Sequence, residues 1–264
     1  MEVKMKTFRF MGLLLCCVVL TGCFGVPEPL PQGPDAVWDL VIIGDSSLRY
    51  LGDAYATVIE EDMGIEVEVH DFTPMTATAG GVLEILAGNT FNNFLYESLE
   101  ERLSEAEVVV MWVNPEASVD PKNPLDMEGC FIYQAPKNCQ PETFDSYIDD
   151  VKDIWRQIIK LRRGKETILR AVDFYNPLLD RWIESGVQTA CTECWDNLSD
   201  AVRSAAEAYD IPLLSVYDAF GGPEHNEDPR LKGFIDEDGR HPSELGAEYT
   251  AELLGAMGYE PTIP

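Results

Sequence analysis

The regular alternation of short apolar segments with longer amphipathic ones is the feature that most constrains the fold of this chain. Each apolar segment is followed by polar or turn residues, a pattern that predicts strands separated by helices. Such an order of elements forms a parallel sheet with helices on both faces. The sequence therefore predicts an α/β fold, a three-layer α/β/α sandwich around a five-stranded parallel sheet. The predicted strands cover residues 38–43, 65–72, 108–113, 167–174 and 212–216.

The periodicity also indicates where the sheet ends and where two helices lie. Apolar and acidic residues alternate over 65–69, which predicts a strand at an edge of the sheet. Apolar residues recur every three or four positions over 142–163 and over 195–209, which predicts amphipathic helices. Neither a repeat nor a change of composition interrupts residues 36–264, so we expect a single domain there.

Residues 1–22 have the layout of an export signal. Three basic residues precede an apolar run at 11–20, and this run is too short to span a bilayer comfortably. The run closes with Leu20-Thr21-Gly22-Cys23, which resembles the lipobox of bacterial-type lipoproteins. That resemblance implies cleavage before Cys23 and a lipid on its thiol. An ordinary signal peptide with an incidental cysteine is the alternative, and in both cases the chain leaves the cytoplasm.

Residues 23–35 are expected to form a tether. Four prolines occur among residues 24–35 without any periodicity, which predicts a stiff, extended segment rather than core. A tether of this kind suits a domain held off a membrane.

The charge of the chain excludes one class of partner. The formal net charge is -28, and removal of residues 1–22 takes away three basic residues and one acidic residue and brings it to -30. Such a surface repels nucleic acid and anionic lipid headgroups, so we expect no nucleic-acid binding. A solvated, soluble exterior explains the acidity, and a salt-rich habitat is the other explanation.

Four cysteines remain in the exported domain. Cys130 and Cys139 lie nine residues apart, and Cys191 and Cys194 form a C-x-x-C. We expect two local disulfides, although four cysteines allow three pairings. A zinc site would need these cysteines in one cluster or joined by histidines, and we expect no metal. A redox dithiol at Cys191 is the weaker alternative, because the residues between the two cysteines offer nothing that lowers a thiol pKa.

Two insertions border the predicted ligand crevice. Residues 115–141 and 177–194 each follow the carboxyl end of a strand, where loops surround the ligand in open parallel sheets. Each insertion contains one of the cysteine pairs, so the disulfides are expected to stiffen the rim of a site. The same positions make Trp112, Asn176 and Trp182 candidates for lining the pocket.

The first predicted strand ends in Gly44-Asp45-Ser46-Ser47, which would display Ser46 at the mouth of the crevice. A serine needs a base to take its proton before it can act as a nucleophile. His241 is the candidate base, and Asp238 precedes it by three residues, a spacing that lets the two side chains meet. The carboxylate would hold the imidazole in the required tautomer. Ser243 follows as a predicted helix N-cap.

Gly44-Asp45-Ser46 together with Asp238-Gly239-Arg240-His241-Pro242 resembles the SGNH, or GDSL, hydrolase family. That family comprises esterases, lipases and carbohydrate deacetylases on a flavodoxin-like sandwich, and the likeness covers residues 38 to about 256. The resemblance implies a serine esterase that works through an acyl-enzyme without a cofactor, with Ser46, His241 and Asp238 as its catalytic residues.

The same resemblance implies an oxyanion hole. Its donors would be the backbone N–H of Ser46, that of Gly80 or Gly81, and the side-chain amide of Asn114. Preorganised donors of this kind can each be worth about 3 kcal/mol of the barrier.

The family pattern is not followed at every position. Trp112 and Pro115 stand where the family usually has a glycine and an aspartate around the asparagine, and Ser47 intervenes before Leu48. The glycine block also begins later than expected.

Each motif also has a purely structural explanation. Asp45 and Ser46 would cap a helix, and Asp238 and Gly239 would form a turn. Their occurrence together in the family order favours one site. Of the other histidines, His70 is expected to be structural at the sheet edge, and the one at position 225 is expected to be solvated.

The resulting hypothesis is a secreted serine esterase, anchored to a membrane by a lipid on Cys23. A short acyl group, such as an acetyl ester of a glycan, is the expected substrate. Activity should fall on the acidic side of neutrality, because His241 must be neutral to act as a base. The competing hypotheses are a non-catalytic lipoprotein that binds a ligand in the same crevice and a disulfide oxidoreductase.

Overall fold

Five parallel strands form one sheet in the order β2-β1-β3-β4-β5, which confirms the predicted fold class. This is the flavodoxin-like strand order. A computed structural model describes residues 27–33, 35–73, 78–88, 98–115, 125 and 127–263. The strands are β1 (Val37–Ile43), β2 (Glu66–Asp71), β3 (Val108–Met111), β4 (Ile168–Val172) and β5 (Leu213–Leu214).

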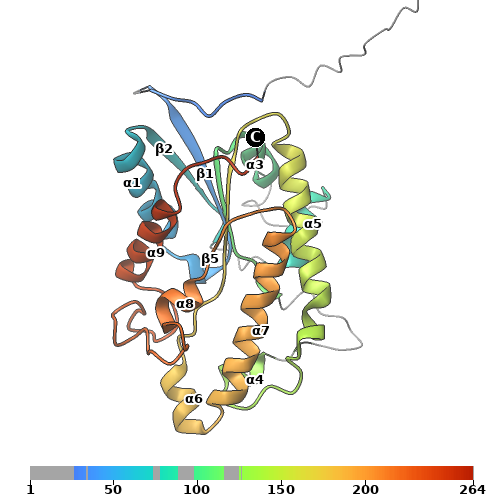
Figure 1. Ribbon diagram of the computed structural model, residues 1–264, viewed down its shortest axis with the longest axis vertical. Coiled ribbons are helices and arrows are strands. Elements are labelled where there is room, and N and C mark those ends of the chain that lie inside the picture. Colours follow the sequence, from blue (N-terminus) through green and yellow to red (C-terminus); the bar gives the residue numbers. More distant parts are fainter. Residues whose placement is uncertain are drawn as a thin grey trace, which may run out of the picture.

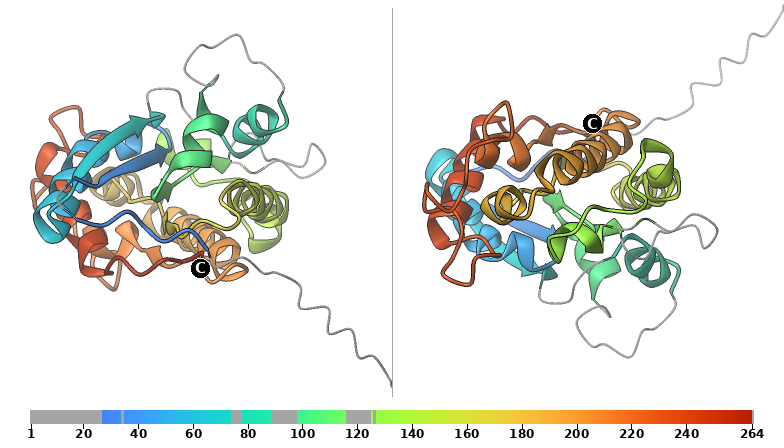
Figure 2. Two further views of the ribbon diagram at one scale, coloured as in Figure 1. Left: turned by 90° about the horizontal axis from the view of Figure 1, so that it is seen from above. Right: turned by 90° about the horizontal axis from the view of Figure 1, so that it is seen from below.

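Helices cover both faces of the sheet (Figure 1, Figure 2). Helices α1 and α9 pack against each other on one face, and α5 packs against α2, α3 and α7 on the other. The helices are α1 (Leu51–Met63), α2 (Ala79–Leu86), α3 (Leu99–Glu105), α4 (Glu128–Phe131), α5 (Asp145–Leu161), α6 (Leu179–Ser185), α7 (Gln188–Glu207), α8 (Val216–Gly221) and α9 (Glu244–Ala256), with 3-10 turns η1 (Ser46–Leu48) and η4 (Pro141–Phe144).

The core strands are apolar because helices bury both of their faces. Leu40–Ile43 of β1 and Val108–Val110 of β3 are fully buried, and the two strands pair in register from Leu40 with Val108. Strand β2 pairs only with β1 and carries exposed acidic residues in alternation, so its prediction as an edge strand is confirmed.

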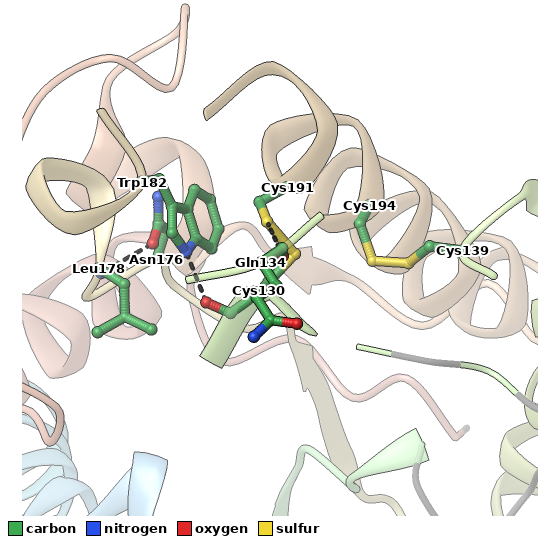
Figure 3. Close-up of a disulfide and its surroundings, with 8 residues drawn as sticks. All are labelled: Cys130, Gln134, Cys139, Asn176, Leu178, Trp182, Cys191 and Cys194. Atoms are coloured by element: carbon green, nitrogen blue, oxygen red, sulfur yellow. Dashed lines mark hydrogen bonds between the residues drawn. A yellow bond between two sulfur atoms is a disulfide. The ribbon is translucent and has the colours of Figure 1, made fainter. Parts of the chain in front are cut away.

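The predicted disulfide pairing is wrong. Helix α7 begins at Gln188, earlier than the predicted helix, so Cys191 and Cys194 lie within its first turns. That end of α7 packs against the segment that contains Cys130 and Cys139, and each helical cysteine meets one cysteine of the segment. The disulfides are therefore Cys130–Cys191, with Cα atoms 5.6 Å apart, and Cys139–Cys194, at 5.2 Å (Figure 3). Paired disulfides are typical of proteins outside the cytoplasm.

Part of the predicted tether is docked on the domain. The backbone of Glu28 accepts a hydrogen bond from Glu166 and donates one to Gly164, each 2.8 Å long. Leu30 is buried in the core, and the carbonyl of Pro31 accepts the Trp38 indole N–H at 2.8 Å. Residues 27–33 are therefore not a free linker, because the buried Leu30 side chain and the hydrogen bonds of the Glu28 and Pro31 backbone hold them on the domain.

This docking occurs at the amino ends of the strands. Gly164 and Lys165 form the turn before β4, and β1 begins a few residues after the docked segment. In Figure 1 this end of the domain lies at the top, together with the C-terminus, whereas α4 and α6 lie at the bottom. The predicted signal at 1–22 and Cys23 lie outside the described residues. No helix among the described residues is long and apolar enough to cross a bilayer.

Reduction of the disulfides should destabilise the domain by about 3 kcal/mol or more. The two bonds close chain segments of 61 and 55 residues, and such loops restrict the unfolded chain strongly. Because the loops interleave, the second bond closes a shorter effective loop and adds less than the first. Urea unfolding with and without reductant measures the change, and an unaltered midpoint would contradict the assigned bonds.

Candidate active site

The end of β1 displays Ser46 through a short, capped 3-10 turn. Asp45 is the N-cap of η1, and its carboxylate accepts the Ser47 N–H at 2.8 Å. A Cβ at Gly44 would lie 2.7 Å from Leu48 Cδ1, so glycine allows the chain to fold back tightly here. Asp45 and Leu48 are buried, whereas Ser46 is exposed. The capping role and the display of the serine are therefore both present.

His241 is held on a short hairpin before α9. Ile235 and Pro242 form an antiparallel bridge, and the Asp236 N–H donates to the His241 carbonyl at 2.9 Å. Gly239 has a φ of +71°, which the tight turn of the hairpin requires. Ser243 caps α9 as predicted, because its hydroxyl accepts a hydrogen bond from the third residue of the helix.

Ser46, His241 and Asp238 form a continuous hydrogen-bonded relay. His241 Nε2 lies 2.9 Å from Ser46 Oγ, and Nδ1 lies 2.7 Å from Asp238 Oδ2. Since an ionised carboxylate only accepts, Nδ1 carries the proton and Nε2 accepts from the serine hydroxyl. The structure thus brings together the three side chains that the sequence predicted, although 195 positions separate the serine from the histidine.

Backbone hydrogen bonds hold the Asp238 carboxylate in place beside the His241 imidazole. Its Oδ1 accepts the backbone N–H groups of Arg240 at 2.8 Å and His241 at 2.9 Å. Partial burial alone would raise the pKa of this carboxyl, but hydrogen bonds from His241 and Arg240 outweigh it and lower the pKa to about 2. Asp238 is therefore charged at neutral pH.

Two contacts hold the hairpin against the serine loop. Arg49, directly after η1, donates from Nη2 to Asp236 at 2.6 Å and to the Pro242 carbonyl at 3.3 Å. Tyr175, beyond the end of β4, donates its hydroxyl to the Arg240 carbonyl at 2.9 Å. Sequence reasoning missed both residues. Their positions just after strands β1 and β4 were the available signal.

Gly246 allows the hairpin to lie close to α9. A Cβ at this helical position would overlap the carbonyl oxygen of Phe234. The Phe234 carbonyl also accepts the Ser243 N–H at 2.9 Å. The hairpin that contains His241 therefore requires glycine at the start of α9.

Of the expected oxyanion donors, only Ser46 and Asn114 lie at the described part of the cleft. Ser46 and Asn114 line the cleft, and Asn114 forms a parallel bridge with Thr78 at the start of α2. The Gly81 N–H is engaged by the Thr78 hydroxyl at 3.1 Å, which leaves Gly80 as the better candidate of the two glycines. Neither glycine belongs to the described lining of the cleft.

A cleft of about 960 Å³ opens beside the relay. Its apolar wall comes from the α4 region and from the residues after β4. The lining residues are Asp45, Ser46, Ser47, Asn114, Leu125, Met127, Glu128, Phe131, Ile132, Phe174, Tyr175, Arg240 and His241.

The three pocket residues expected from the sequence lie behind this wall instead. Trp112 is buried and stacks on Phe174, with ring centroids 5.4 Å apart. Trp182 donates its indole N–H to the Cys130 carbonyl, and Asn176 accepts the backbone N–H of Leu178 (Figure 3). Their expected role was wrong because the insertions fold inward and bury these side chains.

Solved structures share this architecture, whereas no family model and no curated protein matches the sequence. A phospholipase A1 from Streptomyces albidoflavus aligns with a TM-score of 0.52 and 14% identity, over 84% of this chain and 99% of that chain. A protein from Slackia heliotrinireducens described as a candidate SGNH hydrolase aligns with a TM-score of 0.50 and 18% identity, over 84% and 100%. The chain has the SGNH hydrolase fold.

Within this SGNH fold the other two histidines lie outside the cleft. His70 is on edge strand β2, and its Nε2 contacts Asp39 at 2.6 Å. His225 was expected to be solvated, and this was wrong. It stacks on Tyr217 and contacts Asp196 at 3.0 Å and Asp218 at 2.7 Å, because the acidic loop folds back over α7 and α8.

One group of side chains has the composition of a metal site. Ligand atoms of Asp39, Glu68 and His70 lie within 4.8 Å of one another on β1 and β2. The His70–Asp39 contact already satisfies two of these groups, and none of the three residues lines the cleft. The cleft is bordered instead by the Ser46–His241–Asp238 relay, and a relay of this kind supports acyl transfer without a metal in other proteins.

Asp238→Asn should move the proton of neutral His241 from Nδ1 to Nε2. The backbone N–H groups keep the amide oxygen of the new side chain at the Oδ1 position, so its NH₂ group faces Nδ1 and donates. Nitrogen NMR of histidine-labelled protein distinguishes the tautomers, and a His241→Gln variant assigns the signal. A wild-type ring protonated at Nε2 would contradict the relay.

The lowered pKa of Asp238 adds a pH dependence to this comparison. A depressed carboxyl pKa stabilises the fold above the ordinary carboxyl pKa, and the effect is lost as the pH falls toward 2. Wild type should therefore be more stable than Asp238→Asn at neutral pH, and the two should converge in strong acid.

Proposed function

We propose that this protein is an extracytoplasmic serine esterase that cleaves acyl esters through an acyl-enzyme. The observation that carries the proposal is the relay itself: Ser46 Oγ at 2.9 Å from His241 Nε2, and His241 Nδ1 at 2.7 Å from Asp238. Both distances lie within the range needed for proton transfer between a nucleophile, a base and the group that orients the base. The relay also borders a cleft large enough for a substrate.

The geometry leads to a two-step reaction. Ser46 Oγ attacks the ester carbonyl while His241 Nε2 takes its proton, and Asp238 stabilises the imidazolium that forms. His241 then protonates the leaving alcohol, and the acyl group remains on Ser46. Water, deprotonated by His241, attacks this acyl-enzyme in the second step and releases the acid.

The negative oxygen of each tetrahedral intermediate needs donors. The proposed donors are the backbone N–H of Ser46, that of Gly80 and the side-chain amide of Asn114. Gly81 is the weaker choice, because its N–H caps α2 through Thr78. The Ala79 N–H donates a hydrogen bond to the Asn114 carbonyl at 3.1 Å, which links α2 to Asn114. A shift of α2 would therefore also displace Asn114.

The cleft and the docked segment 27–33 lie at opposite ends of the sheet. The docked segment 27–33 is fixed at the amino ends of the strands, and β1 is seven residues long, which places Ser46 about 20 Å further along. Three residues separate Cys23 from Pro27, so four Cα–Cα steps join them and reach about 14 Å at most. A lipid on Cys23 would therefore hold the cleft facing away from its own membrane.

This orientation supports a substrate outside the membrane that bears the enzyme. An acetyl or other short acyl ester of a glycan meets this condition, and the phospholipids of the same bilayer do not. The acidic exterior further disfavours contact with anionic headgroups.

Fluorophosphonate labelling tests the nucleophile. Wild type should be labelled, and Ser46→Ala and His241→Ala should not. Ser47→Ala is the matched control, because that hydroxyl is buried and does not contact His241.

Hydrolysis of p-nitrophenyl acetate should fall at least about a thousandfold in Ser46→Ala. The kcat/KM of the wild type should decline on the acidic side of neutrality.

The competing hypothesis of a non-catalytic binding protein gives the opposite result. It predicts that the wild type is never labelled and that Ser46→Ala binds and functions as wild type does. A p-nitrophenyl series of increasing acyl length would then show no enzymatic turnover, whereas the proposal expects the shortest esters to react best.

Vesicles containing the lipidated protein test the orientation. The anchored enzyme should hydrolyse a soluble acetyl ester as fast as the unanchored Cys23→Ala variant does, and should release no fatty acid from its own vesicle. Insertion of a long Gly/Ser segment after Cys23 is the control, because it removes the geometric restraint. Fatty-acid release by the anchored protein without this insertion would contradict the proposed orientation.

A further inference from the structure

The cleft contains an arginine that the relay does not use. Arg240 immediately precedes His241 and lines the cleft. Apart from His241, it is the one basic side chain among the described lining residues. The chain has 47 acidic and 19 Lys and Arg residues, so a cation on this surface would be expected to meet a carboxylate.

Most other arginines of the described chain do meet one. Arg49 pairs with Asp236, and Arg230 pairs with Asp228 and Asp180. Arg240, by contrast, has no carboxylate of a described residue within 4.0 Å and forms no side-chain hydrogen bond with one.

The position of Arg240 is nevertheless fixed. Its backbone N–H donates to Asp238 at 2.8 Å, and its carbonyl accepts the Tyr175 hydroxyl at 2.9 Å. The guanidinium carbon lies 5.5 Å from the centroid of the Phe131 ring, within cation–π distance. Phe131 is in turn held by the Cys130–Cys191 disulfide next to it. The side chain is thus preorganised while its donors remain unused by described residues.

The other charged groups of the described residues at the cleft do not form an ion pair with this cation. Asp45 is buried and accepts the Ser47 N–H, and Asp238 is committed to His241. Glu128 is exposed on α4 and lies beyond ion-pair distance of Arg240. A guanidinium offers a planar fork of donors that matches a carboxylate or a phosphate.

We propose that Arg240 is a specificity-determining residue that binds an anionic group of the ester substrate. The enzyme would then prefer acyl esters whose alcohol part carries a carboxylate or phosphate, as the sugars of an acidic glycan do. This inference rests on the proposed esterase function and deepens it. The acidic exterior repels anions elsewhere, so Arg240 would offer them a favourable position within the described lining of the cleft.

Paired aryl acetates test the proposal in the full-length protein. The neutral ester is p-nitrophenyl acetate, and its anionic partner carries an added ring carboxylate. Wild type should favour the anionic ester in kcat/KM, and Arg240→Gln should reduce the anionic-to-neutral ratio about tenfold, mainly through KM. Arg240→Lys should retain part of the preference, and added salt should weaken it.

Arg163→Gln is the matched control. It removes one exposed positive charge in the turn before β4, at the far end of the sheet, and should leave the ratio unchanged. Competitive inhibition by benzoate and by phenyl phosphate distinguishes the two anionic groups, since the stronger inhibitor that loses its effect in Arg240→Gln identifies the preferred one.

Each outcome decides between distinct conclusions. Equal losses for both esters in Arg240→Gln would overturn the proposal, because they would show that Arg240 only positions the hairpin. A wild type without any anionic preference would overturn it as well. Turnover of both esters that persists in Ser46→Ala would instead refute the proposed esterase function.

Discussion

The hydrogen bond between Ser46 and His241 depends on the close apposition of two loops from opposite ends of the chain. The serine loop can turn tightly because Gly44 leaves room for Leu48, and the histidine hairpin can approach α9 because Gly246 has no side chain. Arg49 then joins the two loops through Asp236 and Pro242. The relay therefore depends on the packing of the two backbone segments that hold its three side chains.

The wall of the cleft is stabilised differently from the relay. Helix α4 is short, and an isolated helix of this length would not be stable. Two disulfides join it and the following segment to the long helix α7. Buried aromatic rings complete the support, since Phe131 packs edge-on against Trp195, and Trp182 holds the Cys130 carbonyl. Cross-links and aromatic packing thus replace the hydrogen-bonded sheet as the source of rigidity at this rim.

The amino ends of the strands form a second fixed region with no role in the relay. Arg162 is buried there and donates to the Ser104 carbonyl and the Thr167 hydroxyl, each at 2.7 Å. Glu166 accepts the Leu30 N–H and so ties the docked N-terminal segment to the same region. Burial raises the pKa of the nearby Glu107 carboxyl, although hydrogen bonding and Arg162 partly offset this. The docked N-terminal segment therefore lies at one end of the sheet, and the cleft with its relay lies at the other.

The sequence by itself determined the elements whose signals are local. Periodicity predicted all five strands within a few residues, and the alternation of β2 predicted its place at the edge. Two local patterns predicted the residues of the relay. Ser46 was predicted from the polar residues that follow a buried strand, and Asp238 and His241 were predicted from their spacing of three residues. These features are readable because a parallel sheet gathers the ends of its strands on one side, whatever the loops between them do.

Only the tertiary structure decided which distant segments meet. The pairing of Cys130 with Cys191, the burial of Leu30 and the inward position of Trp182 all depend on how insertions pack, and no local pattern encodes that. The same holds for Arg240, which lies in the cleft beyond ion-pair distance of the carboxylates of the described residues because of how the hairpin and α4 pack. Composition and periodicity report the environment that a residue prefers, whereas its neighbours are set by the joint packing of segments far apart in the chain.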